Sequence, residues 1–415
     1  MKKVVVIGGG VIGLCSAYYL IKEGHDVTVV DQSTMDYGAS YVNAGYLTPS
    51  HIIPIAAPGV VKQGIKWMFN SKSPLYIKPS LNPAFLSWAW AFNSSCSEVN
   101  VNRSIRAIKD INLLSADLFS DIKASEGFGF QLENKGLLML CQTEEMLNEE
   151  LHIAKIAREE GLDVTEISRE DIANLQPEVK INSQGGLHYK CDSHTTPHEF
   201  MREMYVWLEE KGVRFYKNEK VTDLRISGEG LIESVITQNH ELVAEEFVLA
   251  AGSWSHFLSK KLGVKIRLQA GKGYRINKDE YTGITIPAIL AEAKVAVTPM
   301  NGFTRFAGTM EIAGINHKIN PLRVNAIAEA VQRYYPEVVV SDVEKKQAAC
   351  GLRPVSPDGR PYIGVSSKCA NLTIAAGHAM MGWSMAPATG KLVSEIISEK
   401  KTSMNISSFH PDRTF

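Results

Sequence analysis

A glycine-rich run near the N-terminus has the GxGxxG spacing of a dinucleotide-binding turn. Gly8 permits the tight turn, and Gly10 leaves room for a pyrophosphate against the backbone. Gly13 lets the following helix pack closely on the preceding strand. That helix would begin with Val11 and Ile12 and offer unpaired N–H groups and a positive dipole end to phosphates. The run therefore predicts a dinucleotide site.

An acidic residue follows at the position where such a turn needs one. Asp31 stands at the end of the second strand-like segment and is followed by Gln32. A carboxylate there can accept hydrogen bonds from the ribose hydroxyls of an adenosine and would repel a 2′-phosphate. We therefore assign Asp31 and Gln32 to the dinucleotide site. This unit alone leaves open whether the dinucleotide is FAD or NAD.

A second group with clear chemistry is Arg353, which stands in the sequence Gly-Leu-Arg-Pro. A guanidinium group presents a rigid, two-pronged set of donors that matches a carboxylate. Arg353 is therefore a candidate for binding the carboxylate of a substrate. The alternative is an ion pair between Arg353 and a structural acid such as Asp358.

Histidine, cysteine and aspartate residues between positions 188 and 198 are of the types that bind metal ions. Their spacing is irregular and Pro197 interrupts it, so we expect no metal. The residues are His188, Cys191, Asp192, His194 and His198.

The elements that must position the glycine run form a βαβ unit. Residues 3–7 are a β-branched run of the buried parallel-strand type, residues 11–23 have helical spacing before Gly24, and residues 26–30 form a second strand. The uncharged stretch 4–21 superficially resembles a secretory signal. Its three consecutive glycines and the lack of a cleavage site argue against that interpretation.

The rest of the chain alternates between two patterns. Buried strands near 246–252 and 372–375 and helices near 198–212 and 386–399 are of the parallel α/β type, whereas residues 265–311 alternate in antiparallel fashion around an Asn-Gly hairpin. The predicted fold class is α/β plus antiparallel β, with a Rossmann-like dinucleotide-binding domain interleaved with an antiparallel-sheet substrate domain. The expected boundaries are 1–60, 143–262 and 345–415 for the first domain and 61–142 and 263–344 for the second.

Composition narrows the class of protein. The 415 residues carry 44 Lys and Arg against 45 Asp and Glu, so a net charge of -1 offers no basic field for nucleic acid. Six cysteines without a CxxC pair argue against a disulfide framework and fit a reducing compartment. We expect a cytoplasmic protein that binds a small-molecule substrate and no nucleic acid.

Several uncommon motifs occur in a fixed order along nearly the whole chain. They are Asn43-Ala44-Gly45 with Pro49, residues 56–60 and 65–69, Lys272-Gly273-Tyr274, residues 310–316, Gly351-Leu352-Arg353-Pro354 with residues 357–359, and Gly377-His378 with residues 382–386. Together they resemble the FAD-dependent D-amino-acid oxidase and dehydrogenase superfamily, and most closely its bacterial D-amino-acid dehydrogenases. Residues 192–197 and 387–389 depart from the family pattern and leave the exact substrate open.

The resemblance implies an FAD cofactor and assigns further residues to it. In the family, a loop of small residues lies beside the flavin, and a segment before the last helix contacts the isoalloxazine ring. The additional expected FAD contacts are Ser40, Asn43, Ala44, Gly45, Tyr46, Leu47, Val221, Ala251, Gly252, Gly377, His378, Met381, Gly382, Trp383, Ser384 and Met385. The matching family arginine makes Arg353 the ligand of the substrate carboxylate, with Tyr274 as a second donor and His51 as a minor candidate for the pocket.

The activity that the resemblance implies is oxidative deamination of D-amino acids to 2-oxo acids and ammonia. A hydride would pass from the α-carbon to flavin N5, and the electrons would go on to a quinone or another acceptor. Oxidation of glycine or of a secondary or cyclic amine, such as D-proline, hydroxy-D-proline or sarcosine, is the alternative within the family. Outside it, the chain would be an NAD-dependent dehydrogenase or a non-catalytic flavin-binding subunit.

An aromatic and lysine-rich segment raises the question of membrane contact. Trp67, Trp88 and Trp90 lie close together in the sequence among lysines and phenylalanines, a composition found at membrane interfaces. One interpretation is peripheral contact with the inner face of the membrane. The other is a buried loop or a contact between subunits.

Overall fold

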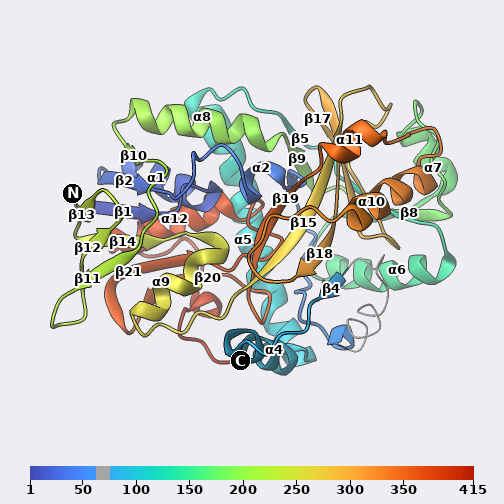
Figure 1. Ribbon diagram of the computed structural model, residues 1–415. Coiled ribbons are helices and arrows are strands. Elements are labelled where there is room, and N and C mark those ends of the chain that lie inside the picture. Colours follow the sequence, from blue (N-terminus) through green and yellow to red (C-terminus); the bar gives the residue numbers. More distant parts are fainter. Residues whose placement is uncertain (62–74) are drawn as a thin grey trace.

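The computed structural model describes residues 1–61 and 75–415, which contain two large sheets and two small ones. In Figure 1 the six-stranded sheet lies on the left and the nine-stranded sheet on the right, with helices α2 (Ala39–Val42) and α5 (Glu98–Glu126) between them. Segments that are distant in the sequence therefore meet where the two large sheets face each other.

The six-stranded sheet carries the predicted βαβ unit. The Val and Ile side chains of its central strand β1 are buried on both faces, as a parallel strand between two layers requires. Neighbouring strands are parallel except for the last pair, β21 and β20. The order is β10 (Arg214–Tyr216), β2 (Asp26–Val30), β1 (Lys3–Ile7), β14 (Glu246–Leu249), β21 (Cys369–Ala376) and β20 (Tyr362–Ser366).

Two helices beside this sheet pack closely on each other. They are α1 (Val11–Lys22), which follows the glycine run, and α12 (Ala386–Ile397) near the C-terminus. A Cβ atom on Gly390 of α12 would lie 2.4 Å from the carbonyl carbon of Cys15 in α1. Only glycine permits this approach, which fixes the last helix against the helix of the glycine run.

The nine-stranded sheet is mostly antiparallel, and helix α10 (Pro321–Tyr334) covers one of its faces with apolar side chains. Asn301-Gly302 forms the predicted hairpin turn, with Gly302 at a φ of 87°. The order is β19 (Ala349–Val355), β15 (Gln269–Lys278), β18 (Phe303–Ile312), β17 (Val295–Met300), β16 (Ala288–Leu290), β6 (Leu137–Cys141), β8 (Gly185–Tyr189) and β7 (Val164–Ser168), with β4 (Leu75–Ile77) beside β18.

Shorter elements complete the described part of the chain. One small sheet contains β3 (Tyr46–Leu47), β9 (Ser193–Thr195) and β5 (Leu132–Glu133), and the other contains β11 (Asp223–Ile226), β12 (Ile232–Ile236) and β13 (Glu241–Val243). The other helices are α4 (Pro83–Ser95), α6 (Glu144–Glu159), α7 (Arg169–Leu175), α8 (Pro197–Glu210), α9 (Ser255–Lys261) and α11 (Asp342–Lys346), with 3-10 turns at Gly252–Trp254 and Ser407–Phe409.

The predicted fold class is confirmed. Two segments, however, contact the large sheet of the other predicted domain. Strands β7 and β8, inside the range 143–262, pair with each other and with β6 in the nine-stranded sheet. Helix α5, inside the range 61–142, packs on α12, and Phe119 and Ile122 belong to the core cluster around β1. The domain boundaries therefore stay a prediction, except that each of these two segments is assigned to the domain whose sheet it contacts.

The aromatic segment divides between core and surface. Trp88 in α4 is 2% exposed, stacks on Phe92 and donates a hydrogen bond from its indole N–H to the carbonyl oxygen of Val355 at 2.9 Å. It is a core residue and cannot contact a membrane. Trp90 is 65% exposed, and Trp67 lies outside the described residues. Among the described residues, no helix is long and apolar enough to cross a membrane.

A buried ion cluster fastens the C-terminal segment and gives a stability prediction. Asp358 is 1% exposed and binds both Arg360 and Arg413 at 2.8 Å. Burial alone would raise the pKa of Asp358, but the two guanidinium groups outweigh it and lower the pKa below its usual range. We expect Asp358→Asn to cost about 3–5 kcal/mol at pH 7, because it leaves two buried cations without a carboxylate.

The sign of the pH dependence follows from that lowered pKa. The contribution of Asp358 is fully present above the pKa of an unfolded aspartate, about 3.9, and is lost as pH falls through the lower pKa of the folded state. Urea unfolding midpoints should therefore differ strongly between wild type and Asp358→Asn at pH 7, begin to converge near about pH 4 and meet only below the lower pKa of the folded state. Asp223→Asn, which removes an exposed ion pair with Lys261, should change little. A difference that persists at low pH would refute this account.

Candidate active site

The glycine run forms a turn in which larger side chains have no room. Gly8 has a φ of 115°, and a Cβ atom on it would lie 2.4 Å from the carbonyl oxygen of Ala250. A Cβ atom on Gly13 would lie 1.8 Å from the carbonyl oxygen of Gly8. Gly10 caps α1 without a side-chain hydrogen bond, and the N–H of Val11 donates to Ser40 Oγ at 2.9 Å. The first turn, which also contains Ile12, is shaped to receive an anionic group.

The carboxylate of Asp31 is fixed beside this turn. Its Oδ2 accepts a hydrogen bond from the N–H of Gly9 at 2.7 Å, and its Oδ1 accepts bonds from the N–H and hydroxyl of Ser33 at 2.7 and 2.6 Å. This position is consistent with a role in holding a ribose next to the phosphates. Gln32 is exposed. Ser33 was not predicted, because its only sequence signal is its position two residues after the acid.

We expect Asp31→Ala to weaken FAD retention, because it removes both the proposed ribose acceptor and the anchor of Gly9 and Ser33. Loss of hydrogen bonds to a charged group costs about 1.5–3 kcal/mol, which corresponds to about a 10- to 150-fold higher Kd for FAD. Fluorescence titration of deflavinated protein measures this change. Ser33→Ala keeps the carboxylate and should show a smaller loss. An Asp31→Ala variant with wild-type FAD affinity would contradict the assigned role.

The loop after α2 is held by hydrogen bonds to β9 of a small sheet and to β18 of the nine-stranded sheet. The side chain of Asn43 accepts a hydrogen bond from the N–H of Gly45 at 2.8 Å, and the carbonyl of Gly45 accepts one from the N–H of Thr195 at 2.8 Å. Gly45 has a φ of 71°, and a Cβ atom on it would lie 2.2 Å from the Thr195 carbonyl oxygen. The buried Arg305 donates to the carbonyl of Asn43 at 2.8 Å. These bonds hold Ala44 and its neighbours in one conformation.

The side chains that follow the loop point into the protein. The hydroxyl of Tyr46 donates to the carbonyl of Ala288 at 2.8 Å and accepts from the N–H of Val297 at 3.0 Å, and Leu47 is buried in the core. Only the backbone of these two residues is therefore available to a cofactor. Their predicted place beside the flavin stays a prediction about the backbone.

The segment 377–385 meets the strand that carries Arg353. The N–H of Ala379 donates to the carbonyl of Pro354 at 2.9 Å, and His378 forms a bridge with Val355. His378 Nε2 lies 3.0 Å from Thr389 Oγ1, and burial lowers the pKa of His378 to about 3, so this ring is neutral. Its side chain is part of the core, and the neighbouring backbone is what a cofactor can reach.

The rest of this segment is bonded to the small sheet and to α5. Trp383 donates its indole N–H to Thr195 Oγ1 at 2.9 Å, and Ser384 donates to Asn112 at 2.6 Å. Met385 is buried, and Gly377 has a φ of 82°. Met381 and Gly382 lie in the turn between Gly377 and Met385. This network holds the turn before α12 rigidly against the rest of the site.

The remaining predicted contacts lie near the glycine turn. Ala251 and Val221 pack against the core cluster that contains Val30, and Gly252 follows Ala251 with a φ of 52°. Val221 is near the second strand, consistent with its expected place by the adenine. These positions agree with one dinucleotide lying along the carboxyl ends of the six-stranded sheet.

Arg353 is a partly buried cation whose guanidinium group lies over Gly273. It stands opposite Gly271 in the β15–β19 pair, and a Cβ atom on Gly273 would lie 2.3 Å from its Nη2. Its Nη1 donates to the carbonyl of Thr309 at 2.8 Å, and no carboxylate among the described residues pairs with it. Burial lowers the pKa of Arg353 to about 10. Because Asp358 is bound by Arg360 and Arg413, the alternative of an ion pair between Arg353 and Asp358 is wrong, and no carboxylate of the described residues competes with an anion for Arg353.

Tyr274 does not join Arg353. Gly271 and Gly273 of β15 lie on the same face of the sheet as Arg353. Tyr274 is the next residue after Gly273 and pairs with Cys350, so its side chain points to the opposite face. Its hydroxyl donates to Glu311 Oε2 at 2.8 Å in the layer that α10 covers. The alternation of side chains along a strand explains the difference. We therefore leave Tyr274 out of the proposed carboxylate site.

His51 is placed close to the segments just described. Its Nδ1 lies 3.1 Å from Ser50 Oγ, and Thr48, three residues earlier, donates its N–H to Ser384 Oγ at 3.1 Å. Burial, with a smaller effect of Lys294, lowers the pKa of His51 to about 4, so the imidazole is neutral. Of the residues considered as metal ligands, Asp192 accepts hydrogen bonds from Ser50.

Several residues that hold the loops of the site together were not predicted for that role from the sequence. Thr195, Arg305, Ser50 and Asp192 hold the loops together, but each does so across a long stretch of chain. No periodicity or motif marks such contacts in a single sequence. The 29-residue helix α5 was also missed, although its buried residues recur every three or four positions between its caps at Ser97 and Gly127.

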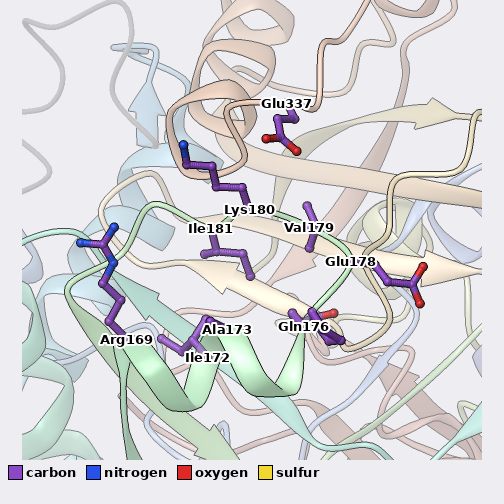
Figure 2. Close-up of a pocket in the computed structure, with 10 residues that line it drawn as sticks. Arg169, Ile172, Ala173, Gln176, Glu178, Val179, Lys180, Ile181 and Glu337 are labelled. Atoms are coloured by element: carbon purple, nitrogen blue, oxygen red, sulfur yellow. The ribbon is translucent and has the colours of Figure 1, made fainter.

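A pocket of about 420 Å³ lies at the opposite edge of the nine-stranded sheet from β19, beside α7. Figure 2 shows its charged side chains, Arg169, Glu178, Lys180 and Glu337, spread around the rim instead of converging on one point. It contains none of the predicted site residues and is separate from the candidate active site.

Known proteins similar to this chain have matching length and fold. A D-amino acid dehydrogenase of Vibrio atlanticus (strain LGP32) is 31% identical over 405 residues, which cover 95% of this chain and 96% of the relative. One from Neisseria meningitidis serogroup C is 32% identical over 412 residues and 96% of each chain. Among solved structures, glycine oxidase from Geobacillus kaustophilus has a TM-score of 0.78 at 20% identity and covers 100% of both chains, which shows the shared fold.

A further solved structure, L-proline dehydrogenase from P. horikoshii, has a TM-score of 0.75 at 19% identity over 99% of this chain and 96% of that one. The family model described as DAO, FAD dependent oxidoreductase, matches residues 3–396. The glycine turn, Asp31 beside it and the N-terminus of α1 fit the FAD that this family uses. The chain therefore belongs to the DAO family of FAD-dependent oxidoreductases.

Proposed function

We propose that this protein is an FAD-dependent D-amino-acid dehydrogenase, which oxidises the Cα–N bond of a D-amino acid. The observation that carries the proposal is Arg353, a partly buried arginine without a carboxylate partner among the described residues, next to the segment 377–385. An amino acid brings the carboxylate that this cation lacks. The name shared by relatives at 31–32% identity over nearly the whole chain supports the same substrate class.

Binding and orientation are the chain's main contribution to the reaction. Arg353 would hold the substrate carboxylate through two parallel hydrogen bonds, and Gly273 lets the guanidinium lie flat on the sheet. This fixes the α-carbon at one distance from the backbone of the segment 377–385. FAD, when bound between these elements, supplies the acceptor for the hydride of the α-carbon. Water then hydrolyses the imino acid to a 2-oxo acid and ammonia.

The proposal includes an electron acceptor other than oxygen, as the relatives' name implies. A quinone would require a place near a membrane surface. Leu86 and Trp90 are exposed on α4, and Trp90 is the one described tryptophan of the aromatic segment that is free to contact lipid. Peripheral contact through α4 is therefore part of the proposal. Cosedimentation with vesicles, compared between wild type and Trp90→Ser, tests it.

The experiment that tests the activity is an anaerobic visible spectrum of the purified protein. D-amino acids, L-amino acids, glycine, sarcosine and hydroxyproline isomers are added one at a time, and bleaching of the flavin band is recorded. Bleaching by D-amino acids alone establishes the reaction and its stereochemistry. Bleaching only by glycine or cyclic amines would move the substrate to that class. A flavin that no amine bleaches would overturn the proposal.

A further inference from the structure

Strand β18 carries one extra residue in its pairing with β15. The register of the pair shifts by one position, so that Thr309 and Met310 of β18 both stand opposite the single residue Gly273 of β15. Such a β-bulge bends the strand and re-aims its groups, and bulges are enriched next to active sites. Gly273 is also the residue over which the guanidinium group of Arg353 lies. The bulge is therefore next to the proposed carboxylate site.

The alternation of side chains along β18 breaks at Thr309. Gly308 faces α10, because a Cβ atom on it would lie 3.3 Å from Ile327 Cγ1. Met310 packs with Val355 on the other face of the sheet, the face of Arg353. Residues two apart in a regular strand share a face. Without Thr309, the residues before and after it would alternate normally and keep their present faces.

The backbone of Thr309 has a conformation that its residue type disfavours. Its φ is 60°, in the left-handed region, where a β-branched residue is rare. The side chain does not compensate for this, because its hydroxyl oxygen is buried and has no hydrogen-bond partner among the described residues. A strained backbone of this kind persists only where the surrounding structure requires it. The requirement must therefore come from the backbone groups of Thr309.

The carbonyl group of Thr309 has such a role. Carbonyl groups of a regular strand lie near the plane of the sheet and bond to the neighbouring strands. The guanidinium group of Arg353 lies on a face of the sheet, since a Cβ atom on Gly273 would be 2.4 Å from its Cζ. The Thr309 carbonyl oxygen accepts a hydrogen bond from Arg353 Nη1 at 2.8 Å, the one hydrogen bond that this guanidinium makes to the described residues. The bulge thus turns a backbone acceptor toward the guanidinium.

We propose that the bulge at Thr309 orients Arg353 for the substrate carboxylate, with Thr309 as a positioning residue that acts through its backbone carbonyl. A guanidinium group holds its five N–H donors in one rigid plane, so anchoring Nη1 restricts the direction of all of them. Nε and Nη2 have no acceptor among the described residues and form an edge that a carboxylate can bind through two parallel hydrogen bonds. The inference rests on the proposed function, in which Arg353 holds a D-amino acid by its carboxylate.

The test is a protein from which Thr309 is deleted. The deletion should keep the other side chains of β18 on their present faces and remove the acceptor of Arg353 Nη1. We expect about a 10- to 100-fold rise in two constants: the KM for a D-amino acid that reduces the wild-type flavin, and the Kd of a carboxylate without an amino group, propionate. Stopped-flow flavin reduction and calorimetry on the FAD-loaded protein measure them. If the deletion protein does not fold, Thr309→Pro replaces it, because proline fixes φ at about −65°.

Three further proteins make the test specific. Thr309→Gly keeps the carbonyl and adopts a positive φ easily, so it should recover most of what the deletion loses. In an Arg353→Leu background, the deletion should add less than about twofold to the loss, because both changes act on the same guanidinium group. Deletion of Glu233, the extra residue of the bulge between β11 and β12, is the matched control and should keep the wild-type KM and Kd.

The inference alone would be overturned by wild-type constants in the deletion protein, since Arg353 would then need no acceptor. A loss in Thr309→Gly equal to that of the deletion would overturn it too, because the side chain and not the carbonyl would then matter. So would losses of the deletion and of Arg353→Leu that multiply in the double variant. A propionate Kd that depends on Thr309, in a protein whose flavin no D-amino acid reduces, would overturn the proposed function instead.

Discussion

Arg353→Leu is expected to lower kcat/KM for a D-amino acid by about 100- to 1000-fold, mostly through KM, while FAD stays bound. Arg353 is partly buried and has no carboxylate partner among the described residues, so the substrate would supply its ionic partner. The variant would leave the substrate carboxylate in a buried site without a cation. Stopped-flow reduction of the flavin at varied substrate concentration separates weaker binding from slower reduction.

Two further variants make this test specific. Arg353→Lys should recover only part of the loss, because an ammonium group is a point charge and lacks the two-pronged geometry. Arg275→Leu removes another arginine from the same strand pair, one whose Nη1 is bonded to the carbonyl of Gln347 at 3.4 Å, and should leave KM nearly unchanged. Because Arg353 has no carboxylate partner among the described residues, Arg353→Leu removes no ion pair there and should not lower the Tm. An unchanged KM would remove Arg353 from the substrate site.

Gly13→Ala is expected to weaken FAD binding by about 100-fold, so that the protein is isolated largely without flavin. The added Cβ atom would lie 1.8 Å from the carbonyl oxygen of Gly8 and 3.3 Å from Val6 Cγ1. Backbone at that distance cannot move aside without opening the turn that must hold the pyrophosphate. The flavin content of the purified protein, measured from its visible absorbance band, and fluorescence titration of the deflavinated protein measure the effect.

Gly228→Ala is the matched control for this substitution. Nothing lies within 4 Å of a Cβ atom at Gly228, and its φ is outside the left-handed region. It should therefore bind FAD as the wild type does. A Gly13→Ala protein with full flavin content and wild-type Kd would mean that the turn is wider in solution and that Gly13 does not shape the FAD site.

The strands and the glycine turn near the N-terminus could be predicted because residues adjacent in the sequence determine their backbone conformation. The strand at Lys3–Ile7, the turn at Gly8 and the strand at Asp26–Val30 follow from β-branched runs and from backbone conformations that glycine alone adopts easily. The strand positions agree with the structure residue by residue. Asp31 also lies next to the glycine turn, because parallel neighbouring strands bring their carboxyl ends to one edge.

Contacts between distant segments could not be predicted in this way. Strands β7 and β8 join the nine-stranded sheet because β6, earlier in the chain, offers an edge to pair with, and no property of residues 164–189 alone specifies that partner. The pairing of Asp358 with Arg413 is of the same kind. It decides whether Arg353 is a structural cation or a free one, although both arginines are equally plausible partners in the sequence.

The sequence by itself therefore determined the glycine turn and the family, and it singled out Arg353 as the candidate ligand of a substrate carboxylate. Only the tertiary structure decided that Tyr274 faces away from Arg353, that Asp192 reaches His51 through Ser50, and which residues hold the loops in place. The physical reason is the range of the interactions. Backbone conformation depends on neighbours along the chain, whereas hydrogen bonds and ion pairs of buried side chains depend on groups that folding brings together.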